Sequence, residues 1–153
     1  MIKISMGYPD AASEMEILKS RSNYNPLEYI NSIADAETLV SLQKVVENIF
    51  VDDKIYMYIT HLAQATRQHP MLKLGISTRG AIALMAASKA TALLKGRSYV
   101  IPDDVMYMYE DVFAHRLILS SNAKINNITA KQILDEIAGS VRKPEISAGQ
   151  GAF

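Results

Sequence analysis

The sequence predicts an all-α fold, a helical bundle preceded by a short N-terminal strand. Apolar residues recur at three- and four-residue spacing along most of the 153 residues, the period of helices that bury one face. Residues that favour helix ends stand where these patterns begin and stop, such as Pro102 at a start and Gly96 at an end. A chain of this length can bury a substantial core as one domain. The sequence leaves open a small two-stranded pairing beside the bundle.

Five to six helices are expected. Their approximate ranges are 9–20, 36–48, 52–68, 78–95, 102–113 and 129–141. The first has Asp10 and Glu14 near its positive end, with Met15 and Leu18 expected to face inward. An irregular link follows at 26–34, with three apolar anchors, Leu27, Tyr29 and Ile30.

The next three helices show clearer apolar stripes. In the second, the stripe consists of Leu39, Leu42, Val46 and Ile49. In the third, Ile55, Ile59 and Leu62 are expected inside, and Pro70 ends the helix. The fourth is rich in alanine and apolar nearly all round, with Ile82, Met85 and Leu93 among its larger side chains. We therefore expect the fourth helix at the centre of the bundle.

The remaining segments complete the expected order. Pro102 opens the fifth helix, and Thr129 caps the last, which turns Ile133 and Ile137 inward. Residues 1–6 alternate apolar with polar side chains and predict a strand. The β-branched segments 49–51 and 99–101 could pair, and 115–119 could be a further extended piece. The Gly- and Ser-containing end, 145–153, is expected to be disordered.

Composition excludes several function classes. Sixteen basic and sixteen acidic residues give a formal net charge of zero, which argues against a nonspecific nucleic-acid binder. The chain has no cysteine, so disulfides and thiolate zinc sites are impossible, and a reducing cytoplasm is the expected compartment. The longest apolar run, 81–87, is too short to span a bilayer, so no membrane partner is expected.

The most informative segment is 74–81, Leu-Gly-Ile-Ser-Thr-Arg-Gly-Ala. Ser77 or Thr78 can cap the following helix, and Gly75 permits a sharp turn before it. Arg79 then falls in the first turn, where the helix dipole disfavours a cation by about 0.3–1 kcal/mol. This placement is favourable if an anion such as phosphate binds at the same helix start; the alternative is an arginine that extends into water.

Motifs along the chain add to this segment. In order they are Gly7-Tyr8-Pro9, Val51-Asp52-Asp53, Ala65-Thr66-Arg67-Gln68-His69-Pro70, the segment at 74–79, Gly96-Arg97-Ser98-Tyr99-Val100-Ile101-Pro102-Asp103-Asp104-Val105 and Ala114-His115-Arg116-Leu117. Together they resemble the C-terminal lid of MoxR-type AAA+ ATPases, over residues 2–144. Thr78 departs from the proline that many relatives carry there, and both residues suit a helix start.

The resemblance implies specific roles and boundaries. Arg79 stands where that family has its sensor-two arginine, which reaches the terminal phosphates of ATP. Residues 1–8 would be the end of the AAA+ core and its hinge, with Gly7, Tyr8 and Pro9 near the nucleotide; 9–144 would be the helical lid, and 145–153 a tail. No phosphate-binding loop G-x-x-x-x-G-K-[ST] is present, so the resemblance implies a fragment whose core lies upstream of Met1.

The implied function belongs to the full-length protein. It would bind ATP and Mg²⁺, with neither held tightly by this fragment alone, and would hydrolyse ATP in a homo-oligomeric ring, expected to be a hexamer. Hydrolysis would drive chaperone-like remodelling or activation of a partner protein that the sequence does not identify. Two alternatives stay open: a free-standing helical interaction module without nucleotide, and the lid of a related AAA+ branch such as magnesium chelatase.

Other polar groups give weaker signals. The chain has three histidines, His61, His69 and His115; His61 and His69 stand eight residues apart with no carboxylate at metal-ligand spacing beside them, and no metal site is expected. The pairs Asp52-Asp53 and Asp103-Asp104 are interpreted as helix caps. For Arg67 and Arg116, subunit contact and internal salt bridge are equally compatible with the sequence.

Overall fold

A computed structural model describes residues 1–23 and 25–145. The chain divides into two compact units, one formed by residues 4–43 and the other by residues 1–3 together with the chain from Lys44 onward. We describe each unit by itself. The expected disordered segment 145–153 lies, apart from Glu145, outside the described residues.

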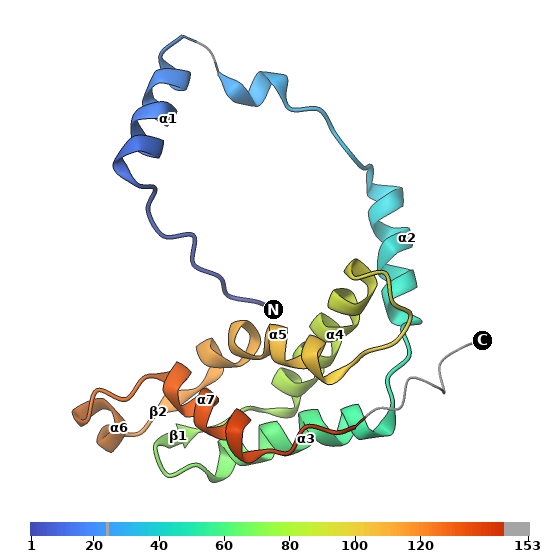
Figure 1. The fold of residues 1–153 in the computed structure, drawn as a ribbon, viewed down its shortest axis with the longest axis vertical. Helices are drawn as coiled ribbons and strands as arrows, with labels where there is room; N and C mark the ends of the chain where they lie inside the picture. The colour runs from blue at the N-terminus through green and yellow to red at the C-terminus, as the bar shows by residue number, and fades with distance from the viewer. Residues whose placement is uncertain (24, 146–153) are drawn as a thin grey trace. The chain divides into compact units, whose positions relative to one another are not determined.

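The smaller unit contains α1 (Ala11–Asn23), the short 3-10 helix η1 (Pro26–Tyr29) and most of α2 (Ala36–Glu47) (Figure 1). Side-chain caps define where the two α-helices begin. Asp10 Oδ1 accepts a hydrogen bond from Ser13 N at 2.8 Å, and Asp35 Oδ1 accepts one from Thr38 N at 2.8 Å. Asp10 therefore precedes α1 as its cap, which moves the helix two residues along from the expected start.

The expected burial in this unit is wrong. Met15, Leu18 and the link residues Leu27, Tyr29 and Ile30 are all exposed. Leu39 and Leu42 of the stripe predicted for 36–48 are exposed as well; its last residue, Ile49, is buried, but it lies beyond α2 in the larger unit. Apolar spacing predicts which residues share a helix face, whereas burial requires a second element against that face.

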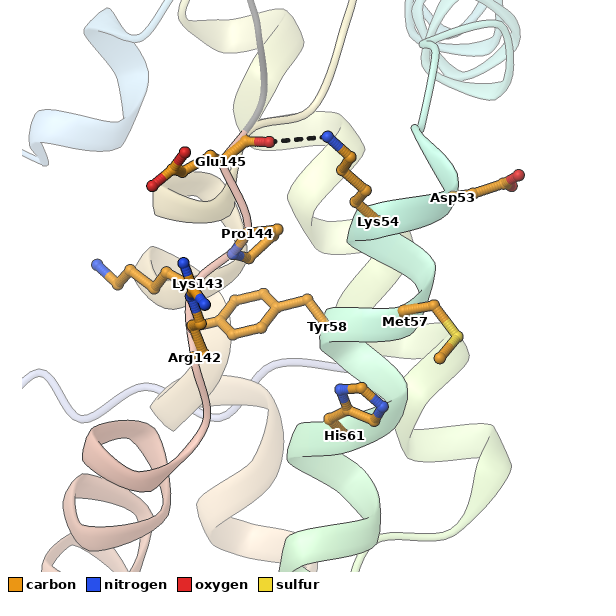
Figure 2. Close-up of a pocket in the computed structure, with 9 residues that line it drawn as sticks. All are labelled: Asp53, Lys54, Met57, Tyr58, His61, Arg142, Lys143, Pro144 and Glu145. Carbon is orange, nitrogen blue, oxygen red and sulfur yellow. Dashed lines mark hydrogen bonds between the residues drawn. The ribbon is translucent and has the colours of Figure 1, made fainter.

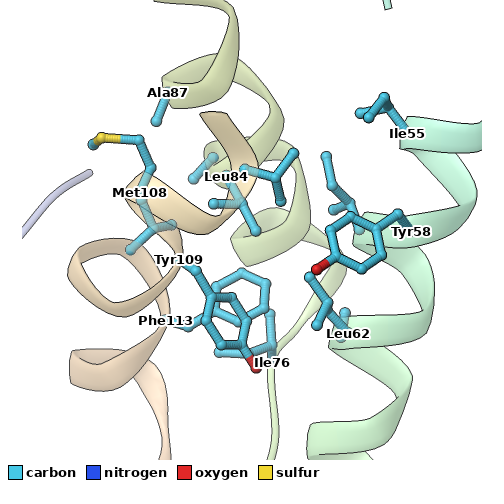
Figure 3. Packing of buried hydrophobic residues seen from close by; sticks show 14 of the residues in the cluster. Ile55, Tyr58, Leu62, Ile76, Leu84, Ala87, Met108, Tyr109 and Phe113 are labelled. Carbon is cyan, nitrogen blue, oxygen red and sulfur yellow. The ribbon is translucent and has the colours of Figure 1, made fainter. Parts of the chain in front are cut away.

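The larger unit is a helical bundle. It contains α3 (Asp53–Gln68), α4 (Thr78–Leu94), α5 (Pro102–Phe113) and α7 (Ala130–Ser140), with the shorter α6 (Ser121–Ile125). Figure 3 shows the part of the core where side chains of α3, α4 and α5 meet. The largest fully buried apolar side chains of the core are Ile55, Tyr58, Leu62, Ile76, Leu84, Val105, Val112, Phe113, Ile133 and Leu134. The inward faces predicted for 52–68 and 129–141 are thus confirmed.

Alanine allows close approach of helices around α4. Ala83, Ala87 and Ala92 are buried on α4 together with Leu84, while Ile82 on another face is exposed. Small side chains let neighbouring backbones pack closely against this helix. The predicted central position of the fourth helix agrees with this burial.

Short extended segments join the helices. β1 (Leu72–Leu74) pairs antiparallel with β2 (Ile118–Leu119); Leu72 faces Leu119, Leu74 faces Ile118, and the register is irregular between Leu72 and Leu74. The predicted pairing of 49–51 with 99–101 is reduced to one parallel bridge between Phe50 and Tyr99. The 3-10 helix η2 (Ala114–Arg116) and α6 were not expected from the sequence.

The predicted N-terminal strand at 1–6 is wrong. These residues form no strand in the described part of the chain, where Lys3 N donates one hydrogen bond, to Asp111 O at 3.1 Å. Alternation of apolar and polar side chains is typical of an extended segment, but a β-strand also requires hydrogen bonds to a neighbouring strand. No helix in the described residues meets the length and hydropathy that crossing a membrane requires.

A buried ion pair fixes the connection from α4 to α5. Asp104 is fully buried and accepts hydrogen bonds from Arg97 Nη1 at 2.7 Å and Arg97 Nη2 at 2.5 Å. It also accepts one from Ile101 N at 3.0 Å, so it is a helix cap, as predicted, and an ion-pair partner as well. Burial alone would raise the pKa of Asp104, but the Arg97, Ile101 and Lys95 contacts outweigh it and hold that pKa below its usual value.

Candidate functional site

The candidate site is the start of α4, residues 76–80. Ser77, one of the two predicted caps, is the N-cap: its Oγ accepts a hydrogen bond from Gly80 N at 3.4 Å. Arg79 lies in the first turn and is exposed. Among the described residues, no hydrogen bond or ion pair is recorded for its guanidinium, so the cation is free to meet an anion at the positive helix end.

Side chains from the end of α3 hold the residue before this cap. Ile76 is buried, and its backbone N–H donates to Thr66 Oγ1 at 2.9 Å. Its carbonyl accepts from Arg67 Nε at 2.7 Å. Thr66 in turn donates to Ala63 O at 2.6 Å. Both backbone polar groups of Ile76 are therefore satisfied by α3 side chains, and the start of α4 is tied to the end of α3.

Gly75 allows the close contact that these bonds require. A Cβ at Gly75 would lie 2.6 Å from Arg67 N and 2.7 Å from Arg67 Cα. The positive-φ glycines among the described residues are Gly7 and Gly96, and Gly75 is not one of them. The expected reason for Gly75, a sharp turn, is therefore replaced by close backbone approach.

Gly80 is the point at which Ile76 and Arg116 lie against the first turn of α4. It is buried; a Cβ there would lie 2.7 Å from Ile76 Cγ2 and 3.4 Å from Arg116 Cδ. The aliphatic stem of Arg116 thus lies over the first turn of α4. The β1–β2 pairing explains this position, because it places the chain after η2 beside the chain before α4.

Contacts to neutral groups hold the Arg116 guanidinium. Its Nη1 donates to Val112 O near the end of α5 and lies 2.7 Å from His115 Nε2. The pKa of His115 is lowered by burial and by the nearby charge of Arg116, against a backbone hydrogen bond to Asp111 that raises it. Neutral His115 can accept from the guanidinium, which has no acceptor of its own.

Three arginines therefore border one helix start. Arg67 bonds to Ile76, Arg79 stands in the first turn, and Arg116 covers Gly80. Of the two roles left open for Arg67 and Arg116, an internal salt bridge is absent among the described residues, where their recorded partners are carbonyls and His115. A local excess of positive charge at a helix N-terminus favours anions, although the whole chain has no net charge.

The other predicted site residues lie in the smaller unit. Gly7 has a φ of 64°, in the left-handed region that glycine adopts easily, and precedes Tyr8, whose side chain is fully exposed. Pro9 follows, directly before the Asp10 cap. This geometry is compatible with a chain turn at 7–9, and the hinge role stays a prediction.

A groove lies away from the start of α4. This open groove of about 500 Å³ lies between the first half of α3 and the segment 142–145. Figure 2 shows the residues that line it: Asp53, Lys54, Met57, Tyr58, His61, Arg142, Lys143, Pro144 and Glu145. Lys54 Nζ donates across it to Glu145 O at 3.1 Å. No residue predicted as a site residue lines this groove. Within the described residues, no group of three or more potential metal ligands occurs.

Sequence reasoning missed two contributors to the site. Thr66 satisfies the buried Ile76 amide, and His115 accepts from Arg116. Thr66 and His115 each directly precede an arginine in the motifs that resemble the lid family, and this position was the one sign in the sequence that they contribute to the site. Their contacts depend on how α3, α4 and α5 pack, which residue spacing does not encode.

Comparisons with known proteins show which proteins this chain is similar to. Residues 64–137 match the family model described as the AAA lid domain. The chain is 41% identical over 144 residues to YeaC, an uncharacterized protein of Bacillus subtilis (strain 168), covering 94% of this chain and 45% of the relative. It is 31% identical over 157 aligned positions to the chaperone MoxR1 of Mycobacterium tuberculosis (strain ATCC 25618 / H37Rv), covering 97% of this chain and 41% of that protein.

A solved structure has the same fold. A crystal structure described as that of a candidate ATPase from Cytophaga hutchinsonii ATCC 33406 superposes with a TM-score of 0.85 at 28% identity, covering 95% of this chain and 47% of the other. The chain thus spans less than half the length of each of these similar proteins.

Proposed function

Residues 64–137 belong to the AAA lid domain family, within a chain of the MoxR type, and we propose that this chain is the lid that senses ATP in a longer AAA+ ATPase. In this proposal Arg79 contacts the terminal phosphates of ATP bound to a core outside these residues. Gly7, Tyr8 and Pro9 form the hinge beside the nucleotide. ATP and Mg²⁺ are cofactors of the longer protein.

The free guanidinium of Arg79 is the observation that carries the proposal. Its backbone is fixed by the Ser77 cap and by the neighbouring buried residues Ile76 and Gly80, while its side chain is exposed. Arginine keeps its charge at every physiological pH and can fork onto two phosphate oxygens. A fixed cation at the terminal phosphates would stabilise charge that develops during phosphoryl transfer.

The helices of the lid would carry the response onward. Because Ile76 is bonded to α3 and Gly80 lies under a side chain from η2, a force on the first turn of α4 reaches its neighbours through direct contacts. In a ring of identical subunits, expected to be a hexamer in the cytoplasm, such movement would couple ATP hydrolysis to remodelling of a partner protein. One similar protein, MoxR1, is described as a chaperone, which supports that direction.

Substitution of Arg79 in the full-length protein tests the proposal. We expect Arg79→Ala to lower kcat for ATP hydrolysis by about 100-fold or more, the usual cost of removing one group that stabilises transition-state charge. Arg79→Lys should also be impaired, because a point charge cannot fork onto two oxygens. Both variants should keep the free energy of unfolding within about 0.5 kcal/mol, as expected for an exposed side chain.

The matched control is Arg142→Ala. Arg142 is also an exposed arginine of the larger unit and lies at the groove, away from α4. Its loss should leave kcat unchanged. Normal ATPase activity of Arg79→Ala, or a collapse of its melting temperature, would show that Arg79 is not the phosphate sensor.

A further inference from the structure

The last turn of α5 and the first turn of α4 are joined by one side chain. Arg116 packs its stem on Gly80 and bonds its guanidinium to Val112 O. We infer that Arg116 is a positioning residue that, together with neutral His115, holds the first turn of α4 in place and thereby aims Arg79. The consequence for ATP rests on the proposed function of Arg79, whereas the effect on the helix start does not.

The contact at Gly80 shows why the stem matters. Gly80 has no side chain, and Arg116 Cδ lies 3.4 Å from the position that a Cβ would occupy there, so the arginine stem lies beside this glycine. Ile76 Cγ2 lies 2.7 Å from the same position, and Ile76 is buried. A buried core residue and the arginine stem therefore both lie against the first turn of α4 at Gly80.

The guanidinium fixes where that stem lies. Val112 O is among the last carbonyls of α5, which have no partner inside the helix, and arginine side chains stabilise such carbonyls. His115 Nε2 lies 2.7 Å from the same Nη1 atom. Because Arg116 only donates, this contact is favourable when His115 Nε2 carries no proton.

The same end of α5 also receives the N-terminal segment. Lys3 N donates to Asp111 O at 3.1 Å, one residue before Val112. A path of direct contacts thus runs from residue 3 through Asp111 and Val112 to Arg116 and then to Gly80. Arg116 is the step of this path that reaches α4, so its loss should loosen the helix start without removing any group that meets nucleotide.

Amide hydrogen exchange on the 153-residue chain tests the positioning directly. In Arg116→Met, which keeps most of the stem, and in Arg116→Ala, the Gly80 and Ala81 amides should exchange about 3- to 10-fold faster, the scale of one lost hydrogen bond. Amides in the middle of α4, such as that of Ala87, should be unchanged and so report that the bundle is folded. Arg142→Met is the matched control and should change neither region.

Substitution of His115 separates its role from general damage. His115→Gln keeps an acceptor for Arg116 and should preserve slow exchange at Gly80, whereas His115→Leu should accelerate it. Unchanged exchange at Gly80 and Ala81 in both Arg116→Met and Arg116→Ala would overturn the inference. Acceleration that extends equally to Ala87 would also overturn it, because the effect would then be on the whole bundle.

ATPase kinetics of the full-length protein test the link to Arg79. Arg116→Met should lower kcat by about 10- to 100-fold with KM changed less than about threefold, the pattern of a misplaced catalytic partner. Adding Arg116→Met to Arg79→Ala should cause no further loss. If Arg79→Ala abolishes activity and Arg116→Met does not affect it, the link is wrong. If Arg79→Ala is fully active, the proposed function fails, and the exchange result still decides the positioning role.

Discussion

At the residue scale, charge placement distinguishes structural from functional arginines. Arg97 is paired with the buried carboxylate of Asp104, whereas Arg79 is exposed with no partner recorded among the described residues. A buried charge that loses its partner is costly, and an exposed one is not. Removal of Arg97 should therefore lower stability, whereas removal of Arg79 should lower activity.

Arg97→Ala should destabilise the chain. Asp104 would stay buried with only Lys95 as a cationic partner, at 3.3 Å, and leaving a buried charge without its main partner costs about 3–5 kcal/mol. Urea unfolding at neutral pH measures this loss. Arg142→Ala serves as the exposed control, and a loss no larger than that of the control would contradict the assignment.

Acid should remove the Asp104 contribution. The folded pKa of Asp104 lies below its ordinary value of 3.8, so the native state binds fewer protons than the unfolded state in that range. The contribution is complete above pH 3.8 and is lost as pH falls through the folded pKa. Asp104→Asn should therefore lack the part of the acid-induced loss of stability that is due to this carboxylate. Urea unfolding at neutral and at acid pH measures this difference in the free energy of unfolding.

His115 should titrate below its ordinary pKa of 6.5. Burial comes first among the causes and the charge of Arg116 second. In Arg116→Met the pKa of His115 should therefore rise, which an NMR titration of the ring protons measures directly. An unchanged His115 titration in that variant would show that the guanidinium does not face the ring.

At the element scale, the start of α4 depends on two glycines for different reasons. At Gly75 an added Cβ would meet the backbone of α3, while at Gly80 it would meet Cγ2 of the Ile76 side chain. Cγ2 can shift through the side-chain torsions of Ile76, whereas the Arg67 and Thr66 backbone atoms can shift only with the helix. The two positions should therefore differ in tolerance, although the sequence presents both simply as glycines beside a cap.

Gly75→Ala should destabilise more than Gly80→Ala. Overpacking costs about 1–3 kcal/mol, and at Gly80 the better helix propensity of alanine returns up to about 1 kcal/mol. Gly80→Val adds a larger branched side chain and should be worse than Gly80→Ala. Chemical unfolding of the three variants gives the order, and equal stability of Gly75→Ala and wild type would contradict the close approach.

At the scale of the whole molecule, these residues contain helices for a lid and no nucleotide-binding loop. The sequence lacks G-x-x-x-x-G-K-[ST], and the chain spans 41–47% of the length of its relatives. We expect the purified chain to be folded and helical by circular dichroism. It should not hydrolyse ATP, and phosphate release above that of a heat-treated control would contradict this expectation.

Local signals in the sequence determined most helices of this protein and the position of Arg79. Asp52, Ser77 and Thr129 cap helices through hydrogen bonds to residues two or three positions away, and Pro102 opens α5. Such contacts depend on neighbours in the chain and are readable from it. The resemblance to the AAA+ lid came from ordered motifs in the same way, and comparison with known proteins confirms it.

Only the tertiary structure decided what meets across the bundle. The β1–β2 pairing, the close approach at Gly75 and the position of Arg116 over Gly80 join segments that lie far apart or on separate helices. The absence of a strand at 1–6 and the exposure of Met15 and Leu18 have the same origin. Pairing and burial depend on which partner arrives at a face, and a local pattern specifies the face without specifying the partner.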